Sequence, residues 1–425
     1  MELKKYKLAD IAKIEISGVD KKTIEGETPV RLCNFVDVYY NWAVTKEKAK
    51  AFMTASAKQT EIDKCSIGKG MVAITKDSET RDDIGIATYI ADDFEDVLLG
   101  YHCALITPNP AIVDGKYLNA FMHTRYIQKY FENNASGSGQ RYTLSNDTIS
   151  NIPVLLPSIE EQHTIGKLLA DLDRKIELNK QINDNLEAMA KQLYDYWFVQ
   201  FDFPNEEGKP YKSSGGAMVW NEKLKREIPE GWYAENICKI ANILSGGTPS
   251  KAVDEYWNNG TIPFFGPTDC NGSVFQIKTA DHITQKGLEH CASSLFEEGI
   301  VIITARGSIG KLVIVGTPMA MNQSCYALQS KEGEYEYLYF LTTQLIDCLK
   351  AKGSGSVFKS IIASDIEHST LCIATDNVVS DFCKKVKPMF EKLKANTIEI
   401  AELTKQRDEL LPLLMNGQAS INYHL

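Results

Sequence analysis

The sequence predicts an α+β protein made of two similar domains, each followed by one long helix. Three observations lead to this prediction: the length of 425 residues, a heptad pattern of apolar residues that occurs twice, and apolar runs that recur in both halves. A chain of this length exceeds the size at which one hydrophobic core keeps growing, so at least two domains are expected.

The heptad pattern predicts two long helices, from about Ser158 to Trp197 and from about Asn377 to Leu414. Steps of four and three residues, and then of seven, are those of the a and d positions of a coiled coil. At 1.5 Å per residue each helix should span about 55 to 60 Å. The first set is Ile165, Leu169, Leu172, Ile176, Asn179, Leu186 and Leu193, and the second is Phe382, Val386, Met389, Leu393, Asn396, Leu403 and Leu410.

Asn179 and Asn396 occupy corresponding positions of this seam. A buried amide there lowers stability but selects one register and one partner. The alternative is that the ends of the seam are open and both amides are hydrated. In an intramolecular antiparallel pair the two seams run against each other, and the two helices hold a globular domain at each end.

The globular parts also correspond. Ile11, Ala12 and Ile14 match Ile240, Ala241 and Ile243; Gly70–Ile74 matches Gly299–Ile303; and the loop Ser136–Gly139 matches Gly353–Gly355. Short β-branched runs at Met71–Thr75, Val301–Thr304 and Leu312–Val315 are bounded by turn residues and predict strands. Helical patterns at Val113–Glu132 and Gly333–Lys352 then make each domain α+β, around a compact sheet.

These patterns divide the chain into five parts. Residues 1–156 form the first domain, 157–200 the first long helix, 201–230 a linker, 231–375 the second domain and 376–425 the second long helix. The segment after Phe201 is polar and rich in Gly, Pro and Ser, so an exposed linker is expected there.

Composition excludes several classes of protein. The ten cysteines are scattered singly, so neither a metal site nor a disulfide framework is expected, and Cys33, Cys103, Cys325 and Cys372 are predicted to be core residues. No apolar stretch is long enough for a membrane span and no signal peptide is recognised, so a cytoplasmic location is expected. The net charge of −10 argues against binding nucleic acid by bulk charge, although a few cations on one face are enough for selective binding.

Catalytic motifs are missing. The segment Ser308–Leu312 has a Gly-Lys pair without the glycine spacing of a phosphate loop, and no Gly-x-Ser-x-Gly elbow occurs. A methyltransferase would need a glycine-rich cofactor loop together with an acidic-proline-aromatic tetrad, and no such pair is found.

Motifs spread over nearly the whole chain resemble the specificity subunits of Type I restriction-modification systems. The central region of that family is resembled by Ile152–Pro157, Glu161-Gln162, Leu172–Glu177, Leu193–Phe198 and Phe201–Phe203. A target-recognition domain is resembled by Ile228–Trp232, Ser245–Lys251, Tyr256-Trp257, Arg306–Gly310 and Asn322-Gln323, and the distal helix end by Leu410–Gly417.

The resemblance implies a subunit without catalysis of its own that binds double-stranded DNA. It implies two target-recognition domains that each read half of an asymmetric bipartite target, and helical stems that pair as an antiparallel coiled coil and set the spacer. It also implies two modification (methyltransferase) subunits and the restriction (motor and nuclease) subunits as partners. No cofactor is then expected on this chain, and S-adenosylmethionine, ATP and Mg are expected in the partners.

Candidate DNA-binding residues in the second domain are polar side chains on the loops that carry the resemblance. Arg306 is the leading one, because a bidentate arginine on guanine is the commonest specific contact; an ion pair with Glu297 is its alternative. The full set is Thr248, Ser250, Lys251, Asp269, Arg306, Ser308, Asn322 and Gln323.

The first domain departs from the family pattern, with Ile16–Asp20 in place of the Gly-Gly-Thr-Pro loop and Gly100–His102 near the position of Asn322-Gln323. Its candidates are cations with neighbouring polar or aromatic groups, although the run from Lys46 to Lys50 could equally be the solvated face of a short helix. They are Lys46, Lys48, Lys50, Lys58, Gln59, Arg81, Arg141 and Tyr142.

Large apolar groups near the helix ends, Trp197, Phe198, Leu413 and Leu414, are candidates for packing against the other helix or the modification subunits, with core packing as the alternative. A DNA-modifying enzyme that has kept this recognition module is the rival function. S-adenosylmethionine binding by the chain would separate the two.

Overall fold

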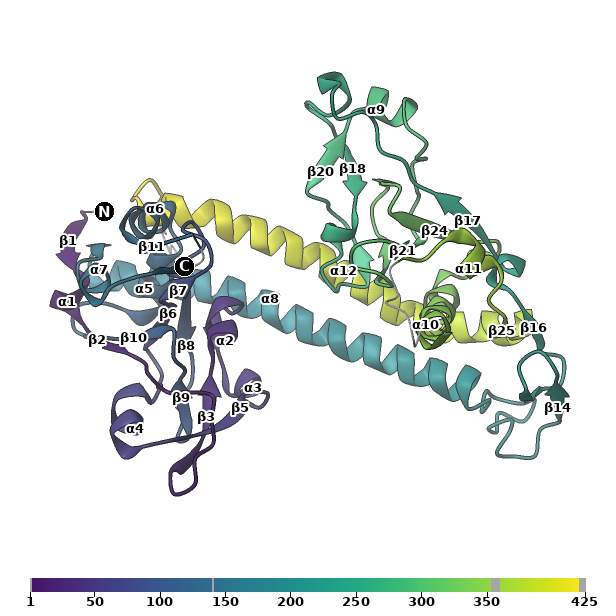
Figure 1. Cartoon of the computed structure of the whole chain (residues 1–425), viewed down its shortest axis with the longest axis horizontal. Helices are drawn as coiled ribbons and strands as arrows, with labels where there is room; N and C mark the ends of the chain where they lie inside the picture. Colours follow the sequence, from purple (N-terminus) through teal and green to yellow (C-terminus); the bar gives the residue numbers. More distant parts are fainter. Residues whose placement is uncertain (1, 140, 353–359, 420–425) are drawn as a thin grey trace, which may run out of the picture. The chain divides into compact units, whose positions relative to one another are not determined.

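A computed structural model describes residues 2–139, 141–352 and 360–419 (Figure 1). The loop Gly353–Gly355, predicted to match Ser136–Gly139, lies outside these residues. The chain divides into two compact units, one formed by residues 1–177 with 402–425 and the other by residues 178–401.

The globular part of the first unit contains thirteen strands and seven short helices within the described residues 4–139 and 141–156. They are β1 (Lys4–Lys7), α1 (Leu8–Ile11), β2 (Ala12–Ile16), β3 (Thr28–Cys33), α2 (Phe35–Tyr39), β4 (Ala43–Val44), α3 (Lys46–Ala49), β5 (Met53–Ala57), α4 (Gln59–Cys65), β6 (Val72–Thr75), β7 (Asp77–Ser78), β8 (Ala87–Ile90), β9 (Val97–Leu99), β10 (Cys103–Pro108), α5 (Gly115–Met122), α6 (Arg125–Asn134), β11 (Ser136–Ser138), β12 (Arg141–Thr143), α7 (Asn146–Ser150) and β13 (Pro153–Leu156).

The second unit has a globular part with the same plan. Its elements are β14 (Met218–Asn221), β15 (Arg226–Pro229), β16 (Tyr233–Glu235), η2 (Ile237–Lys239), β17 (Ala241–Ser245), η3 (Asp254–Tyr256), β18 (Ile262–Phe265), η4 (Pro267–Asp269), β19 (Phe275–Gln276), β20 (Asp281–Ile283), α9 (Gln285–Glu289), β21 (Val301–Thr304), β22 (Leu312–Val315), β23 (Ala320–Met321), β24 (Cys325–Ser330), α10 (Tyr335–Lys352), α11 (Ala363–Glu367) and β25 (Leu371–Ile373).

Sheet topology confirms the internal repeat. The five-stranded sheet β2-β10-β6-β8-β4 of the first domain has the strand order of β17-β24-β21-β22-β19 in the second. The three-stranded sheet β5-β3-β9 likewise matches β20-β18-β23, and the pair β1-β13 matches β16-β25. In both five-stranded sheets the short last strand pairs in parallel, β4 with β8 and β19 with β22. The mixed α+β class is therefore confirmed for both domains.

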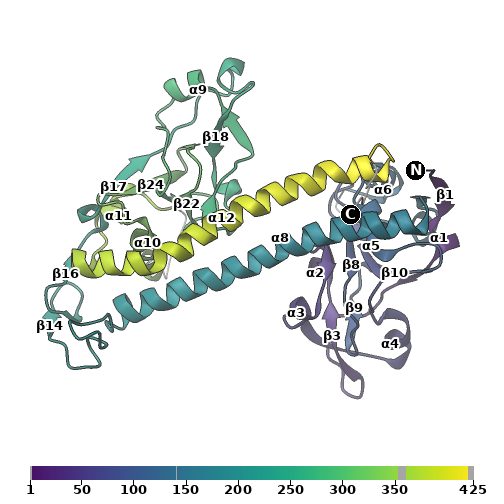
Figure 2. The same cartoon turned by 180° about the vertical axis from the view of Figure 1, so that it is seen from behind.

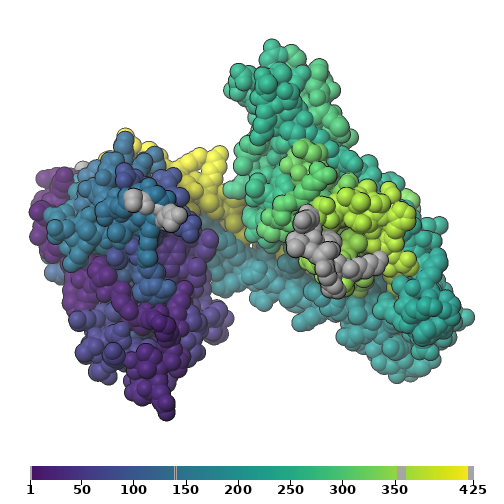
Figure 3. Space-filling view, viewed as in Figure 1, coloured from purple at the N-terminus to yellow at the C-terminus, as the bar shows by residue number. Residues whose placement is uncertain are grey.

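One small sheet is found in the first domain without a counterpart among the described residues of the second. It has the order β11-β12-β7, and β12 pairs with β7 through Tyr142 opposite Ser78 and Thr143 opposite Asp77. Figure 3 shows purple and blue segments, far apart in the sequence of this domain, side by side on one surface. The hairpin thus carries Arg141 to the end of β6, a place that its sequence position does not suggest.

The two long helices are α8 (Ile159–Tyr194) and α12 (Asp376–Met415), close to the predicted bounds. A π-helical turn, η1 (Asp195–Val199), ends the first of them. Figure 1 and Figure 2, seen from opposite sides, show the two helices side by side. Hydrogen bonds join Asn179 to Glu399 and Asn183 to Thr397, so the order of the partners is opposite along the two helices.

All fourteen residues of the predicted seam are buried or half-buried. The buried ones are Ile165, Leu169, Ile176, Asn179, Phe382, Val386, Leu393 and Asn396, and the half-buried ones are Leu172, Leu186, Leu193, Met389, Leu403 and Leu410. The helices also cover the domains. Ile165 and Leu169 belong to the core of the first domain with Leu411 and Leu414, and Phe382 and Leu393 belong to that of the second with Trp197 and Phe198. The apolar stripe is therefore wider toward the helix ends than a strict seam.

The two seam asparagines are buried, at 2% exposure for Asn179 and 0% for Asn396, and so are not hydrated. They do not face each other. The Asn179 amide donates to a Glu399 carboxylate oxygen at 2.8 Å, and the Asn396 amide donates to the Asn183 side-chain oxygen at 2.9 Å. Asn183 was not predicted as a seam residue. Each amide thus takes its partner from outside the predicted seam.

The prediction of an exposed linker at 201–230 is wrong for its two ends. Phe201 and Phe203 are buried against Trp232, and β14 and β15 form a hairpin. Burial of the apolar ring surface stabilises this packing, although the surrounding sequence is polar. The single helix predicted at Val113–Glu132 is in fact two helices, because the Thr124 hydroxyl caps α6 by accepting the Ile127 amide.

Cys33, Cys103, Cys325 and Cys372 are buried, as predicted. Within the described ranges, no helix combines the length and apolar character that crossing a membrane requires.

Candidate nucleic-acid interface

The Gly-Gly loop after β17 lies against the segment that leads into β24. A Cβ on Gly246 would stand 2.2 Å from the Asn322 carbonyl oxygen, so only glycine fits this close approach. The approach places Thr248 beside Gln323, and the Thr248 hydroxyl donates to the Gln323 side-chain oxygen. Two candidates from distant parts of the sequence are therefore brought together.

Arg306 lies just after β21, beside the segment that leads into β24. The amides of Ala305 and Arg306 donate to the Ser324 carbonyl at 2.8 and 3.2 Å. The Arg306 side chain is exposed, and in the part of the chain that the structure describes it makes no ion pair, with Glu297 or any other carboxylate. The backbone of Arg306 is therefore fixed, and its exposed guanidinium can donate to a ligand.

Ser308 lies two residues further along this loop and is half-buried. Its carbonyl accepts the Thr304 hydroxyl, which closes the turn. Gly307, at φ +77°, would place a Cβ 3.7 Å from Pro267. The Arg306 loop thus lies beside η4.

Asp269 and Asn322 form structural hydrogen bonds. The two carboxylate oxygens of Asp269 accept the amides of Gly266 and Ala280, at 2.8 and 2.9 Å. The side-chain oxygen of Asn322 accepts the Ser324 amide at 2.9 Å. These bonds fix the loops around Arg306, which gives both residues a supporting role beside any contact with DNA.

Ser250 and Lys251 follow Thr248 in the sequence and are exposed. The Ser250 carbonyl accepts the Trp257 indole N–H at 3.1 Å, and the Lys251 ammonium lies 5.5 Å from the centre of the same ring. The aromatic ring thus orients a cation next to the loop.

In the first domain the corresponding loops hold a cluster of Asp77, His102 and Arg141. The His102 Nδ1 lies 2.5 Å from Asp77 Oδ2, and Arg141 Nη2 lies 3.2 Å from the same oxygen and 2.6 Å from the ring nitrogen. His102 has a φ of 70°, an uncommon conformation for a residue other than glycine. Such conformations persist where the surrounding structure imposes them and often lie at functional sites.

Asp77 is the centre of this cluster and is mostly buried, with 12% of its side chain exposed. Burial acts to raise its pKa, but hydrogen bonds from Thr143, His102 and Arg141 and the charge of Lys76 outweigh burial, so the pKa is lowered. The carboxyl group is therefore ionised near neutral pH and holds the two neighbouring donors.

A concave surface of about 570 Å³ opens beside the cluster, lined by Phe35, Val36, Tyr39, Tyr40, Asp77, Ser78, Glu79, Thr80, Asp83, His102 and Arg141. The Tyr39 hydroxyl donates to Asp83 at 2.6 Å, and this bond to a carboxylate raises the pKa of Tyr39 to about 12. Two of the predicted residues meet nearby, because the Arg81 guanidinium lies 5.2 Å from the centre of the Tyr142 ring.

The other predicted residues of the first domain have contacts away from this cluster. Lys48 is tied to the first long helix by an ion pair with Glu177 at 3.2 Å, with 17% of its side chain exposed. Lys50 pairs with Glu47, and the Gln59 amide donates to Asp63. Lys46 and Lys58 are exposed at the starts of α3 and α4. In the run from Lys46 to Lys50, a short helix thus exposes Lys46 and Lys50 but not Lys48.

Strand register shows that the two clusters occupy the same place in the repeated fold. Thr75 pairs with Cys103 in the first domain, and Thr304 pairs with Cys325 in the second. Two residues after the threonine come Asp77 and Arg306, and just before the cysteine come His102 and Ser324. The Lys76 amide donates to the His102 carbonyl at 2.7 Å, as the Ala305 amide does to that of Ser324 at 2.8 Å.

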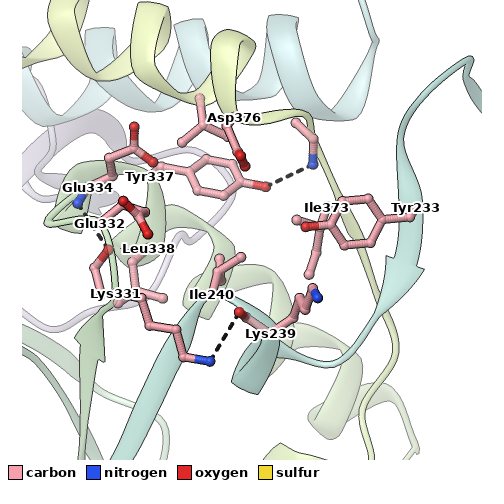
Figure 4. A pocket seen from close by; sticks show the side chains of 13 residues that line it. Tyr233, Lys239, Ile240, Lys331, Glu332, Glu334, Tyr337, Leu338, Ile373 and Asp376 are labelled. Atoms are coloured by element: carbon pink, nitrogen blue, oxygen red, sulfur yellow. Dashed lines mark hydrogen bonds between the residues drawn. The ribbon is translucent and has the colours of Figure 1, made fainter.

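A second cavity, of about 210 Å³, lies in the second domain between β16, η2 and the first turns of α10 and α12 (Figure 4). Glu334 and Asp376 line it at the starts of these helices, where carboxylates stabilise the helix dipoles. Burial and the charge of Asp376 raise the pKa of Glu334. Because the helix termini account for these acids, we assign this cavity a structural role.

Within residues 2–139, 141–352 and 360–419, no three metal-ligating side chains come together. Sequence reasoning missed Asp77 and Asn183, and noted His102 only as a departure from the family pattern. The signal that could have identified Asp77 is its place two residues after a predicted strand, as for Arg306.

The fold and these loops define a class of protein: two repeated α+β domains, joined through two long helices, that present different polar side chains on one framework. A model of the Type I restriction modification DNA specificity domain matches residues 1–188 and 229–375. The chain belongs to this family of Type I restriction-modification specificity proteins.

Relatives support the assignment over most of the chain. The chain is 25% identical over 393 residues to the HindI specificity subunit of Haemophilus influenzae, a match that covers 80% of this chain and 85% of that protein. It is 28% identical over 334 residues to the MjaIX specificity subunit of Methanocaldococcus jannaschii, covering 74% and 71%. The S subunit from M. genitalium has the same fold, with a TM-score of 0.59 at 15% identity over 97% of this chain and 96% of that one.

Proposed function

We propose that this chain is the noncatalytic DNA-reading subunit of a Type I restriction-modification complex, and that each domain reads one half of an asymmetric, bipartite target. The observation that carries the proposal is the equivalence of the two clusters. One framework position holds Asp77 and His102 in the first domain and Arg306 and Ser324 in the second. A repeated scaffold with different polar groups at one place suits the reading of two different sequences.

We further propose that α8 and α12 pair as an antiparallel coiled coil that sets the spacer between the half-sites. Their 36 and 40 residues correspond to about 54 and 60 Å of helix. The full or partial burial of all fourteen seam residues and the opposite order of partners in the Asn179 and Asn183 contacts support this pairing. Deleting one heptad from each helix should change the spacing of the methylated half-sites and leave the bases within each half unchanged.

The partners follow from the same proposal. Two modification subunits dock on the helical stems and the restriction subunits join them, so S-adenosylmethionine, ATP and Mg are held by the partners. A pocket with a volume of about 360 Å³ at one end of the helices is available for such docking. It is lined by Trp197, Val378 and the exposed Lys384 and Lys385, among others.

The test is to reconstitute the complex with its modification subunits and to map the methylated adenines. Exchange of residues 231–375 for the matching domain of a relative should change one half of the methylated sequence only. An unchanged sequence would refute the reading by two domains. Saturable binding of S-adenosylmethionine to the isolated chain would refute the noncatalytic role and favour a DNA-modifying enzyme.

A further inference from the structure

Each domain presents an exposed arginine at the same end of its five-stranded sheet, but the two arginines come from different elements. In the second domain Arg306 stands directly after β21. In the first domain the equivalent position is Asp77, and this carboxylate binds Arg141, which is delivered by β12. Both domains therefore present a guanidinium. In the second domain it belongs to Arg306, the residue two positions after the paired threonine, and in the first domain it comes from a hairpin bound to the equivalent residue, Asp77.

Arg141 is held loosely. Its side chain is 60% exposed, against 12% for Asp77. All contacts of its guanidinium with the described residues involve Nη2. Neither Nε nor Nη1 has an acceptor among those residues. A guanidinium that keeps one bond to a buried carboxylate can offer its remaining N–H groups to a planar acceptor pair.

His102 limits how Arg141 can bind. Its Nδ1 lies near both Asp77 and Arg141, but one nitrogen either donates to the carboxylate or accepts from the guanidinium. When Nδ1 carries a hydrogen bonded to Asp77, Nε2 is the acceptor of the ring, and Arg141 Nη2 lies 3.3 Å from Nε2 and 3.2 Å from the carboxylate oxygen. His102 therefore orients the cluster while Arg141 stays available.

We propose that Arg141, positioned by Asp77 and His102, reads a guanine in the first half-site, as Arg306 reads a guanine in the second. This inference rests on the proposed function and adds the class of base recognised in each half. Guanine is the base whose major-groove edge offers the two adjacent acceptors, O6 and N7, that an arginine binds in bidentate fashion. The target then contains a guanine in both halves, although the two domains use unlike residues at the framework position.

The experiment uses the complex with its modification subunits and the variants Arg141→Lys and Arg306→Lys. Lysine keeps the positive charge and loses the bidentate geometry. The complex should bind its target more tightly than a target in which one guanine is replaced, and discrimination is the ratio of the two affinities. We expect Arg141→Lys to lower this ratio by roughly 10- to 100-fold for one guanine in the first half, and Arg306→Lys to do so for one in the second half. Asp77→Asn should weaken discrimination at the guanine affected by Arg141→Lys. Arg125→Lys, on the exposed start of α6, is the matched control and should change neither half.

Several results would overturn the inference. One is a methylated sequence that lacks guanine in either half. Another is an equal loss of affinity for all DNA sequences in Arg141→Lys, since that indicates a phosphate contact. The domain exchange tells this failure from failure of the proposed function: if the exchange alters one half-site and Arg141→Lys does not, only the inference about guanine is wrong.

Discussion

His123 should make the first unit lose stability as the pH falls. Its ring stacks on Trp42 with centroids 4.3 Å apart, and the Arg407 guanidinium lies 4.8 Å from the centre of the Trp42 ring. The His123 Nε2 donates to the Ala87 carbonyl at 2.9 Å, while its Nδ1 has no partner in the residues that the structure describes. A proton added at Nδ1 would therefore gain no acceptor among these residues.

Burial, and then the charge of Arg407, lower the pKa of His123 from 6.5 to about 4. The unfolded chain binds this proton near pH 6.5 and the folded chain only near pH 4, so protons favour unfolding between these values. The stabilising contribution is complete above pH 6.5 and is lost as the pH falls. By pH 5 the loss amounts to about 2 kcal/mol.

The assay is the free energy of unfolding in urea between pH 7 and pH 5, for the chain and for His123→Gln. Glutamine can keep the donor to Ala87 and cannot be protonated. The other titrating groups are common to both proteins, so the variant should lose about 2 kcal/mol less over this range. Equal losses in the two proteins would refute the buried, neutral state of His123.

Three further predictions concern buried polar contacts and one glycine. Asn396→Leu or Asn183→Leu alone should lower the free energy of unfolding by about 1 to 3 kcal/mol, because each leaves a polar partner unpaired. In urea titrations the double variant should recover most of the lost free energy. Additive losses would contradict the pairing. Gln162→Ala should cost about 2 kcal/mol or more, since the amide bonds the Ile112 and Pro157 carbonyls; Lys167→Ala on the same helix is the control for this measurement. Gly246→Ala should weaken DNA binding and stability, measured in parallel, whereas Gly18→Ala, with open space around its Cβ, should change neither.

The repeat could be predicted from the sequence because its signals are local. The seam residues recur at a constant offset, and the runs at Val301–Thr304 and Leu312–Val315 are strands with the predicted bounds. A heptad pattern or a β-branched run depends on neighbours a few positions away. The break in the helix at Thr124 was missed because the apolar pattern continues across the capping residue.

The candidate site could be predicted only in part. Thr248 and Gln323 were named separately, and the structure brings them into contact across 75 positions of sequence. Lys48 was named for its charge, but its ion pair with Glu177 requires the helix to lie beside α3. Side-chain type marks a residue as able to bind DNA, and the packing decides whether the side chain is already bound to the protein.

The sequence by itself determined the two long helices, the duplicated α+β scaffold and the class of the protein, because periodicity and recurring motifs are written in neighbouring residues. Only the tertiary structure decided which polar groups meet. Asp77 and Arg141 are joined by the pairing of β7 with β12, and Asn183 meets Asn396 through the opposed helices. Contacts of this kind depend on how distant segments pack, and no local pattern specifies them.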